Sequence, residues 1–140
     1  MTDPRALYHA TIVKHDREPL HEGPLANATH VATVDNPLCG DVVTIRVVVE
    51  DGVIIDAAFE ARGCSLARAG ASMVTSRAIG NTPRAMHELA ATVEQLVAAA
   101  PDAPVPPDLG ELEAFVPVRA FKSRRSCACL GFRAIDAALR

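Results

Sequence analysis

The dipeptide Asp51-Gly52 limits the possible folds more than any other feature of the sequence. It lies between two runs, residues 42–50 and 53–61, that are rich in β-branched side chains. An Asp-Gly pair supplies the two positive φ angles that a two-residue type I′ turn requires. The pattern therefore predicts an antiparallel hairpin.

The open end of this hairpin brings separate segments together. Asp41 directly precedes the first strand, and Gly63 and Cys64 directly follow the second. The two ends of an antiparallel hairpin are neighbours, so we expect Cys39, Asp41 and Cys64 to converge there. Gly40 and Gly63 permit sharp bends of the backbone beside a ligand.

The rest of the chain predicts an edge strand and several helices. Thr82 is the expected N-cap of a helix that starts at Pro83, and Ser126 that of the last helix. Residues 101–107 are a proline-rich connector. We expect an edge strand over residues 30–34 and helices over residues 4–15, 65–79, 83 onward, 109–115 (before Pro117) and 127–139. Strands followed by helices indicate an α+β fold. We expect a small antiparallel sheet of about three strands packed against helices. The length indicates one domain over residues 1–140.

Composition excludes several classes of function. The net charge is −3 and aromatic residues make up 4% of the chain, with no Trp, which argues against nucleic-acid binding. No apolar run approaches the roughly 20 residues that span a bilayer, so no membrane association is expected. The first residues do not resemble a signal peptide, and we therefore expect a cytoplasmic protein.

Four cysteines carry most of the chemical information. Without an export signal, cysteines more often bind metal or react than form disulfides. They are Cys39, Cys64, Cys127 and Cys129, and none forms a Cys-x-x-Cys pair. The site must therefore be assembled from segments that are distant in the sequence.

Cys39, Asp41, Cys64 and Cys127 lie at element boundaries and could share one centre. Three thiolates and one carboxylate match the four ligands of a tetrahedral zinc ion. Cys64 and Cys127 are expected at helix N-termini, whose partial positive charge lowers a thiol pKa.

Simpler roles remain open for some of these residues. Cys64 could be a small buried side chain, and Asp41 could cap a turn. Cys129 lies two residues beyond Cys127, about 200° around a helix, so a structural role is favoured for it. Basic residues near Cys127 could offset the negative charge of the site or simply face solvent; they are Lys122, Arg124 and Arg125. No metal-ligand spacing links the histidines, which we interpret as surface or capping residues: His9, His15, His21, His30 and His87.

Three motifs together resemble the IscU/SufU family of iron–sulfur cluster assembly proteins, over about residues 7–139. They are Asp35-Asn36-Pro37-Leu38-Cys39-Gly40-Asp41, Gly63-Cys64-Ser65 and Arg125-Ser126-Cys127-Ala128. The SufU type is the closer match, because the scaffold (IscU) type has a histidine where Ser126 stands. Residues 83–108 also look like the insertion of the SufU type. The chain departs from that type at Ser126, where lysine is common, at Cys129, where threonine is usual, and at Arg68.

The resemblance implies a site and an activity. It implies metal ligands at Cys39, Asp41, Cys64 and Cys127, with zinc as the metal. It also implies that Cys39 accepts persulfide sulfur from a cysteine desulfurase, a SufS-like PLP enzyme, and that downstream iron–sulfur assembly proteins are partners. One alternative is a scaffold that assembles and carries a [2Fe–2S] cluster. A further alternative is a structural zinc domain that mediates protein contacts.

Overall fold

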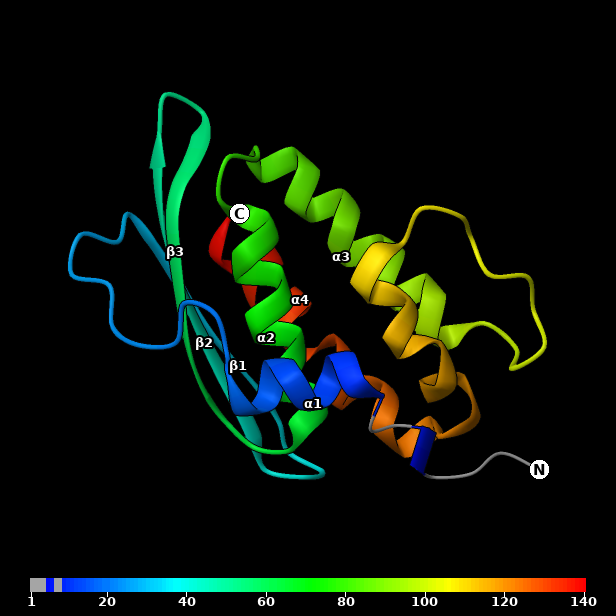
Figure 1. Ribbon diagram of the computed structural model, residues 1–140. Coiled ribbons are helices and arrows are strands. Elements are labelled where there is room, and N and C mark those ends of the chain that lie inside the picture. Colours follow the sequence, from blue (N-terminus) through cyan, green and yellow to red (C-terminus); the bar gives the residue numbers. More distant parts are fainter. Residues whose placement is uncertain (1–4, 7–8) are drawn as a thin grey trace.

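A three-stranded antiparallel sheet with helices packed on one face forms the molecule (Figure 1). The computed structural model describes residues 5–6 and 9–140. Its elements are α1 (Ala10–Arg17), β1 (His30–Asn36), β2 (Asp41–Glu50), β3 (Val53–Arg62), α2 (Ser65–Ala78), α3 (Pro83–Ala98), the 3₁₀ helices η2 (Gly110–Ala120) and η3 (Lys122–Arg124), and α4 (Arg125–Ala138). The predicted α+β class is confirmed.

The predicted hairpin is present and has the expected turn. Asp51 and Gly52 have φ angles of 52° and 78°, both positive as a type I′ turn requires. The sheet order is β1-β2-β3, with β1 at the edge, as predicted. β1 is two residues longer than the predicted strand, and its last residue, Asn36, pairs with Asp41 of β2. The loop from Asn36 to Asp41 therefore sits at the end of the sheet opposite the turn.

The core lies between the sheet and the helices α2 and α4. Alternate residues of β2, namely Val43, Ile45 and Val47, are fully buried beneath these helices. Phe132 of α4 packs edge-to-face against Phe115 of η2, with ring centroids 6.0 Å apart. This packing joins α4 to η2.

Two predicted helix starts differ from the structure. The first helix begins at Ala10, not at residue 4, and extends to Arg17; the predicted contributions of Leu7 and Tyr8 lie outside the described residues. Ser126 is not the N-cap of the last helix, because α4 begins at Arg125. An N-cap residue needs a non-helical backbone, whereas here η3 leads directly into α4 and the Arg125 N–H donates to the Lys122 carbonyl.

The segment after the connector also differs in its winding. A short helix ending before Pro117 was expected, but η2 continues through Pro117 to Ala120 as a 3₁₀ helix. Proline disrupts an α-helix by interfering at the i−4 carbonyl, and a 3₁₀ helix uses the i−3 carbonyl instead. Thr82 caps α3 as predicted, and its hydroxyl accepts a hydrogen bond from the Ala85 N–H at 3.1 Å. Residues 101–107 form neither helix nor strand.

Residues 83–108 are fastened to the rest of the molecule by two arginines. Buried Arg119 donates to the carbonyl of Leu96 near the end of α3, and to the carbonyl of Ala103 in the connector, at 2.7 and 2.9 Å. On the other side, Arg133 of α4 forms a bidentate pair with Glu94 of α3. These contacts join residues 83–108 to η2 and α4.

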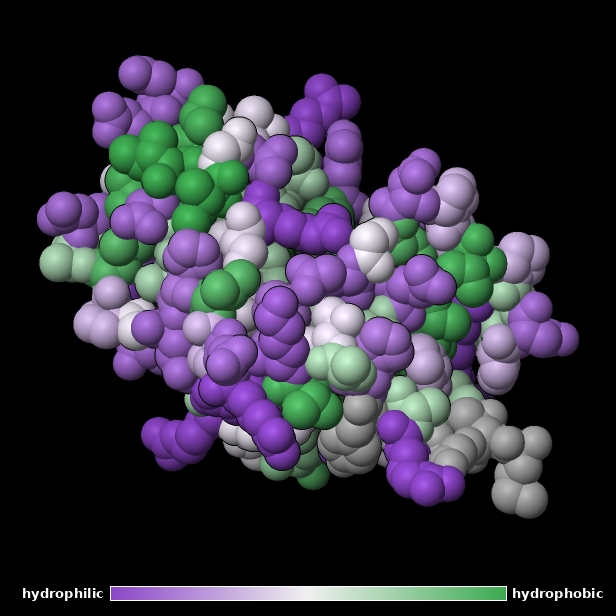
Figure 2. All heavy atoms as spheres, viewed as in Figure 1, coloured by the Kyte–Doolittle hydropathy of each residue, from purple (hydrophilic) through white to green (hydrophobic). Residues whose placement is uncertain are grey.

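Exposed apolar side chains lie at both ends of the hairpin. Figure 2 shows a hydrophobic area over the tip of the β2–β3 hairpin, where Val53 and Ile55 are partly exposed. Leu38 lies at the opposite end and is 95% exposed. Within the described residues, no helix is long and apolar enough to cross a membrane.

Candidate metal centre

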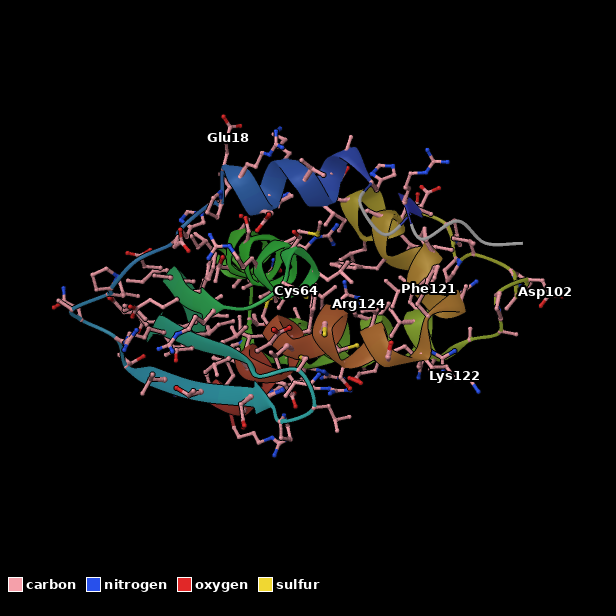
Figure 3. The ribbon with its side chains drawn as sticks, turned by 90° about the horizontal axis from the view of Figure 1, so that it is seen from below. Glu18, Cys64, Asp102, Phe121, Lys122 and Arg124 are labelled. Atoms are coloured by element: carbon pink, nitrogen blue, oxygen red, sulfur yellow. The ribbon has the colours of Figure 1, made fainter. Side chains whose placement is uncertain are left out.

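Three segments meet at the open end of the hairpin. They are the turn that carries Cys39 and Asp41, the Gly63-Cys64 step between β3 and α2, and the first turn of α4 with Cys127. Figure 3 views this end and shows Cys64 at the start of α2, with Arg124 on the neighbouring segment that leads into α4.

The side chains at this end form a compact donor group. One ligand atom each from Cys39, Asp41 and Cys127 lies within 4.8 Å of the other two. The two sulfurs of Cys39 and Cys127 are 3.5 Å apart. Sulfurs on a tetrahedral zinc are separated by about 3.8 Å, since Zn–S bonds are about 2.3 Å long. The spacing of this pair therefore suits a zinc ion.

Cys64 joins the group through Asp41. Its sulfur lies 3.3 Å from Asp41 Oδ2 but outside the mutual group of three. We expected Cys39, Asp41 and Cys64 to converge. The mutually close residues are instead Cys39, Asp41 and Cys127, and Cys64 lies beside the Asp41 carboxylate.

Burial differs sharply among the donors. Cys127 is 1% exposed and Asp41 is 4% exposed, whereas Cys64 is half-buried and Cys39 is exposed. The centre therefore has two buried donors, Asp41 and Cys127, and one exposed thiol, that of Cys39.

The position of the Asp41 carboxylate depends on Gly63. A Cβ atom added at Gly63 would overlap the carboxylate, and the φ of Gly63, 150°, also disfavours other residues. On the same side, the backbone N–H of Cys64 donates to Asp41 Oδ1 at 3.3 Å. The carboxylate thus occupies space that exists because residue 63 lacks a side chain.

The pKa values of Cys64 and Cys127 are raised, contrary to the predicted lowering. Burial raises the pKa of Cys64, and Asp41 raises it further; the N–H groups of Ala67 and Leu66 at the start of α2 oppose this but do not outweigh it. Burial, together with Cys39, Cys64 and Asp41, also raises the pKa of Cys127. A bound cation would favour the thiolates.

The neighbouring residues Arg125 and Cys129 have contacts of their own. Arg125 donates to the Arg119 carbonyl at 2.9 Å, and its Nε is buried without a hydrogen-bond partner among the described residues. Cys129 is fully buried, and its burial and the nearby charge of Glu94 raise its pKa to about 12. Cys129 thus faces α3, in keeping with a structural role.

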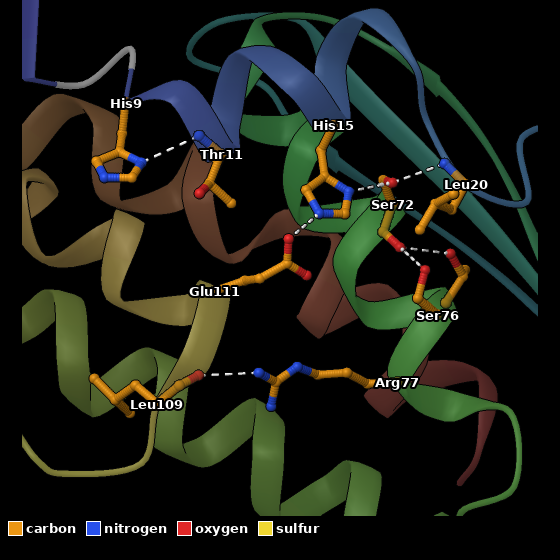
Figure 4. Close-up of polar contacts among 10 residues, drawn as sticks. His9, Thr11, His15, Leu20, Ser72, Ser76, Arg77, Leu109 and Glu111 are labelled. Atoms are coloured by element: carbon orange, nitrogen blue, oxygen red, sulfur yellow. Dashed lines mark hydrogen bonds and ion pairs between the residues drawn. The ribbon is translucent and has the colours of Figure 1, made fainter.

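His15 is buried, whereas the sequence interpretation made it a surface or capping residue. Its Nδ1 lies 2.7 Å from Ser72 Oγ and its Nε2 lies 2.8 Å from Glu111 Oε2, while the Leu20 N–H donates to Ser72 Oγ (Figure 4). The spacing of His15 from buried Ile12 on one face of α1 was an available signal. His9 does cap α1, since its Nδ1 accepts from the Thr11 N–H.

The unexpected Arg68 anchors the start of α2. It pairs with Asp16 of α1 at 3.1 Å and with Glu22 at 2.8 Å, and it donates to the Ala61 carbonyl of β3 at 3.1 Å. Ser65 Oγ also donates to Asp16. The residue after Cys64 is therefore tied to α1.

Asn36 is a further site residue that the sequence interpretation used only as part of a motif. It is buried, and its Nδ2 donates to Cys127 Sγ at 3.9 Å. Asparagine is common in turns, so its position alone did not distinguish a contact with sulfur from a turn role.

Known proteins resemble the chain over nearly its whole length. The sequence model described as NifU-like N terminal domain matches residues 7–139. A Streptococcus pyogenes serotype M1 protein named iron-sulfur cluster assembly scaffold protein IscU is 31% identical over 134 residues, which cover 96% of this chain and 83% of that protein.

A second relative and a solved structure extend the comparison. The Bacillus subtilis (strain 168) protein named zinc-dependent sulfurtransferase SufU is 32% identical over 131 residues, covering 93% of this chain and 87% of that protein. The crystal structure of a nitrogen-fixing NifU-like protein (N-terminal) from Brucella abortus superposes with a TM-score of 0.87 at 28% identity, covering 97% and 94% of the two chains.

Proposed function

The chain belongs to the NifU-like N-terminal domain family, and from this premise we propose that it is a zinc-dependent sulfurtransferase of iron–sulfur cluster assembly. In this proposal Cys39, Asp41, Cys64 and Cys127 are the zinc ligands. Cys39 accepts sulfur from a cysteine desulfurase, a PLP enzyme of the SufS type, and passes it to downstream assembly proteins. The similarity to the named sulfurtransferase supports this assignment.

One observation carries the proposal. In the donor group, Asp41 and Cys127 are buried, and Cys39 is the one exposed thiol. Four protein ligands would also fill a purely structural zinc site, so the exposure of Cys39 is the feature that favours transfer. An exposed ligand whose neighbouring ligands are buried can meet a partner's sulfur without unfolding of the site.

The donor set also fits zinc chemically, because sulfur and carboxylate are both zinc ligands. When bound, zinc would keep the thiols ionised and would supply no redox chemistry. The rest of the reaction belongs to the chain and its partner. The Cys39 thiolate attacks the terminal sulfur of the persulfide on the desulfurase, the S–S bond breaks, and the desulfurase cysteine leaves as a thiolate. The product is a persulfide on Cys39.

The test combines metal analysis with trapping of the persulfide. We expect one zinc per chain, and mass spectrometry after alkylation should find persulfide on Cys39 when a desulfurase and cysteine are present. Cys64→Ser and Cys127→Ser should lose most zinc, and Asp41→Ala, which keeps three thiols, should lose less. Full zinc retention in Cys64→Ser and Cys127→Ser, or persulfide formation elsewhere than on Cys39, would contradict the assignment.

A scaffold for a [2Fe–2S] cluster is the second candidate. It is favoured by the similarity to the named IscU scaffold, at nearly the same identity as the sulfurtransferase. The absence at Ser126 of the histidine of the scaffold type, and the resemblance of residues 83–108 to the insertion of the SufU type, favour the first candidate. Anaerobic purification separates the two, because a scaffold would be brown with sulfur-to-iron absorption, whereas a zinc protein would be colourless.

A further inference from the structure

Asn36 occupies a central place at the proposed zinc site without being one of its ligands. It is the last residue of β1, it is only 6% exposed, and it pairs across the sheet with the proposed ligand Asp41. A buried amide is costly unless its polar atoms are hydrogen-bonded. Its partners therefore show what the amide does.

The acceptors of Asn36 hold the turn that carries Cys39. Its side-chain Oδ1 accepts from the Leu38 N–H at 3.2 Å. Its backbone carbonyl accepts from the N–H groups of Cys39 and Gly40, at 3.2 and 2.8 Å. Three successive N–H groups of the turn are thus bound to one residue.

Packing contributes little to the position of this turn. Residues 37–40 are all exposed, and the Leu38 side chain at the tip is 95% exposed. The position of Cys39 therefore depends more on the hydrogen bonds that Asn36 accepts from the turn than on apolar contacts.

The donor of Asn36 points to the other side of the site. Its Nδ2 lies 3.9 Å from Cys127 Sγ, and Cys127 Sγ in turn lies 3.5 Å from Cys39 Sγ. An N–H group directed at a sulfur ligand stabilises negative charge on that sulfur and fixes its position, as residues around metal ligands commonly do. The Asn36 amide thus contacts both the turn that carries the exposed Cys39 and the buried sulfur of Cys127.

We propose that Asn36 is a positioning residue for sulfur transfer. Its Oδ1 holds the turn so that Cys39 is presented to the partner, and its Nδ2 holds Cys127 in the metal-binding position. The inference rests on the proposed sulfurtransferase function. It adds that the two sulfurs are aligned by one side chain, through two separable bonds.

Two substitutions separate these bonds. Asn36→Asp keeps an oxygen for the Leu38 N–H but lacks the N–H donor to Cys127, whereas Asn36→Ala removes both. Asn81→Ala is the matched control, because Asn81 caps the far end of α2, where it donates to the Arg77 carbonyl. The three variants are compared for zinc affinity by chelator competition, for the rate of Cys39 alkylation in the zinc-bound protein, and for KM and kcat of desulfurase-driven persulfide formation.

Asn36→Asp should weaken zinc binding by about 10- to 100-fold, the usual effect of losing a group that supports a metal ligand, while the KM for the desulfurase stays near that of the wild type. Asn36→Ala should weaken zinc to a similar degree and also raise the KM and change the alkylation rate of Cys39. Asn81→Ala should change none of these quantities.

Wild-type zinc affinity in Asn36→Asp, or the same KM and alkylation rate in Asn36→Asp and Asn36→Ala, would overturn the inference. If wild-type protein forms no persulfide, the proposed function fails. Zinc affinity and Cys39 alkylation then still decide whether Asn36 positions the two sulfurs. Should Asn36→Ala not fold, Asn36→Asp alone tests the bond to Cys127.

Discussion

At the scale of single residues, Gly63 shows how a proposed ligand is accommodated by a missing side chain. The Asp41 carboxylate lies where a Cβ on residue 63 would be. Substitution at Gly63 should therefore affect the carboxylate before it affects the fold.

Gly63→Ala should displace the Asp41 carboxylate and reduce zinc content, with a loss of stability of about 1–3 kcal/mol from crowding and backbone strain. Metal analysis and thermal unfolding measure the two effects. Gly23→Ala is the control, because Gly23 has a similar φ, 139°, but no atom within 4 Å of an added Cβ. Gly23→Ala should lose stability and keep zinc, and equal zinc content in both variants would contradict the role given to Gly63.

The sequence predicted which residues lie close together better than it predicted their environment. The Asp51-Gly52 turn was sufficient to place Asp41 beside Cys64, since hairpin geometry is local. It could not give the depth of burial, so the pKa direction predicted for Cys64 from the helix start was wrong. His15 was misplaced for the same reason, because its partner Glu111 is 96 residues away.

At the scale of elements, the pairing of α3 with α4 is the clearest local electrostatic contact. Arg133 Nε and Nη2 lie 2.8 and 2.7 Å from the two carboxylate oxygens of Glu94. The hydrogen bond from Arg133 lowers the pKa of Glu94 below its ordinary value. The folded state therefore gains stability from this pair at pH values above the ordinary carboxyl pKa, and loses it as the pH falls through the lowered value.

A double-mutant cycle with Glu94→Gln and Arg133→Met should measure a coupling of about 0.5–1 kcal/mol at pH 7, which is modest because both side chains are partly exposed. The coupling should disappear on acidification below about pH 4. Denaturant unfolding at several pH values gives the result. The equivalent cycle on the highly exposed pair of Arg84 and Glu88 should give a coupling near zero, and a coupling at positions 94 and 133 that does not change with pH would refute the assignment.

Helix boundaries were predicted only where local chemistry determined them. Thr82 and Pro83 gave the start of α3, because an N-cap hydroxyl and a first-turn proline act within a few residues. The start of α4 and the continuation of η2 through Pro117 depend instead on 3₁₀ winding. Nothing in the side-chain pattern distinguishes that winding from an α-helix.

At the scale of the whole molecule, the proposed ligands lie at one end and the β2–β3 turn lies at the other (Figure 1). The proposed ligands come from three segments, namely the 36–41 loop, the start of α2 and the start of α4. The hairpin turn connects only β2 and β3. Binding of a metal to the folded state should stabilise the ligand end more than the turn.

Removal of zinc by a chelator should lower the melting temperature and increase hydrogen exchange in residues 36–41 and 63–66, with little change in residues 50–54. Hydrogen-exchange mass spectrometry with and without zinc measures this pattern, and re-addition of zinc should reverse it. An equal increase along the whole chain would show that zinc supports the fold globally, and no increase at residues 36–41 would argue against Cys39 and Asp41 as ligands.

The late position of Cys127 in the chain has a consequence for biosynthesis. A nascent polypeptide leaves the ribosome from its N-terminal side, so Cys39, Asp41 and Cys64 emerge well before the helix that carries Cys127. The same helix, together with α2, covers the inner face of the sheet, including Val43 and Ile45. At the proposed site, metal binding would therefore require the same late helix that completes the cover of the sheet.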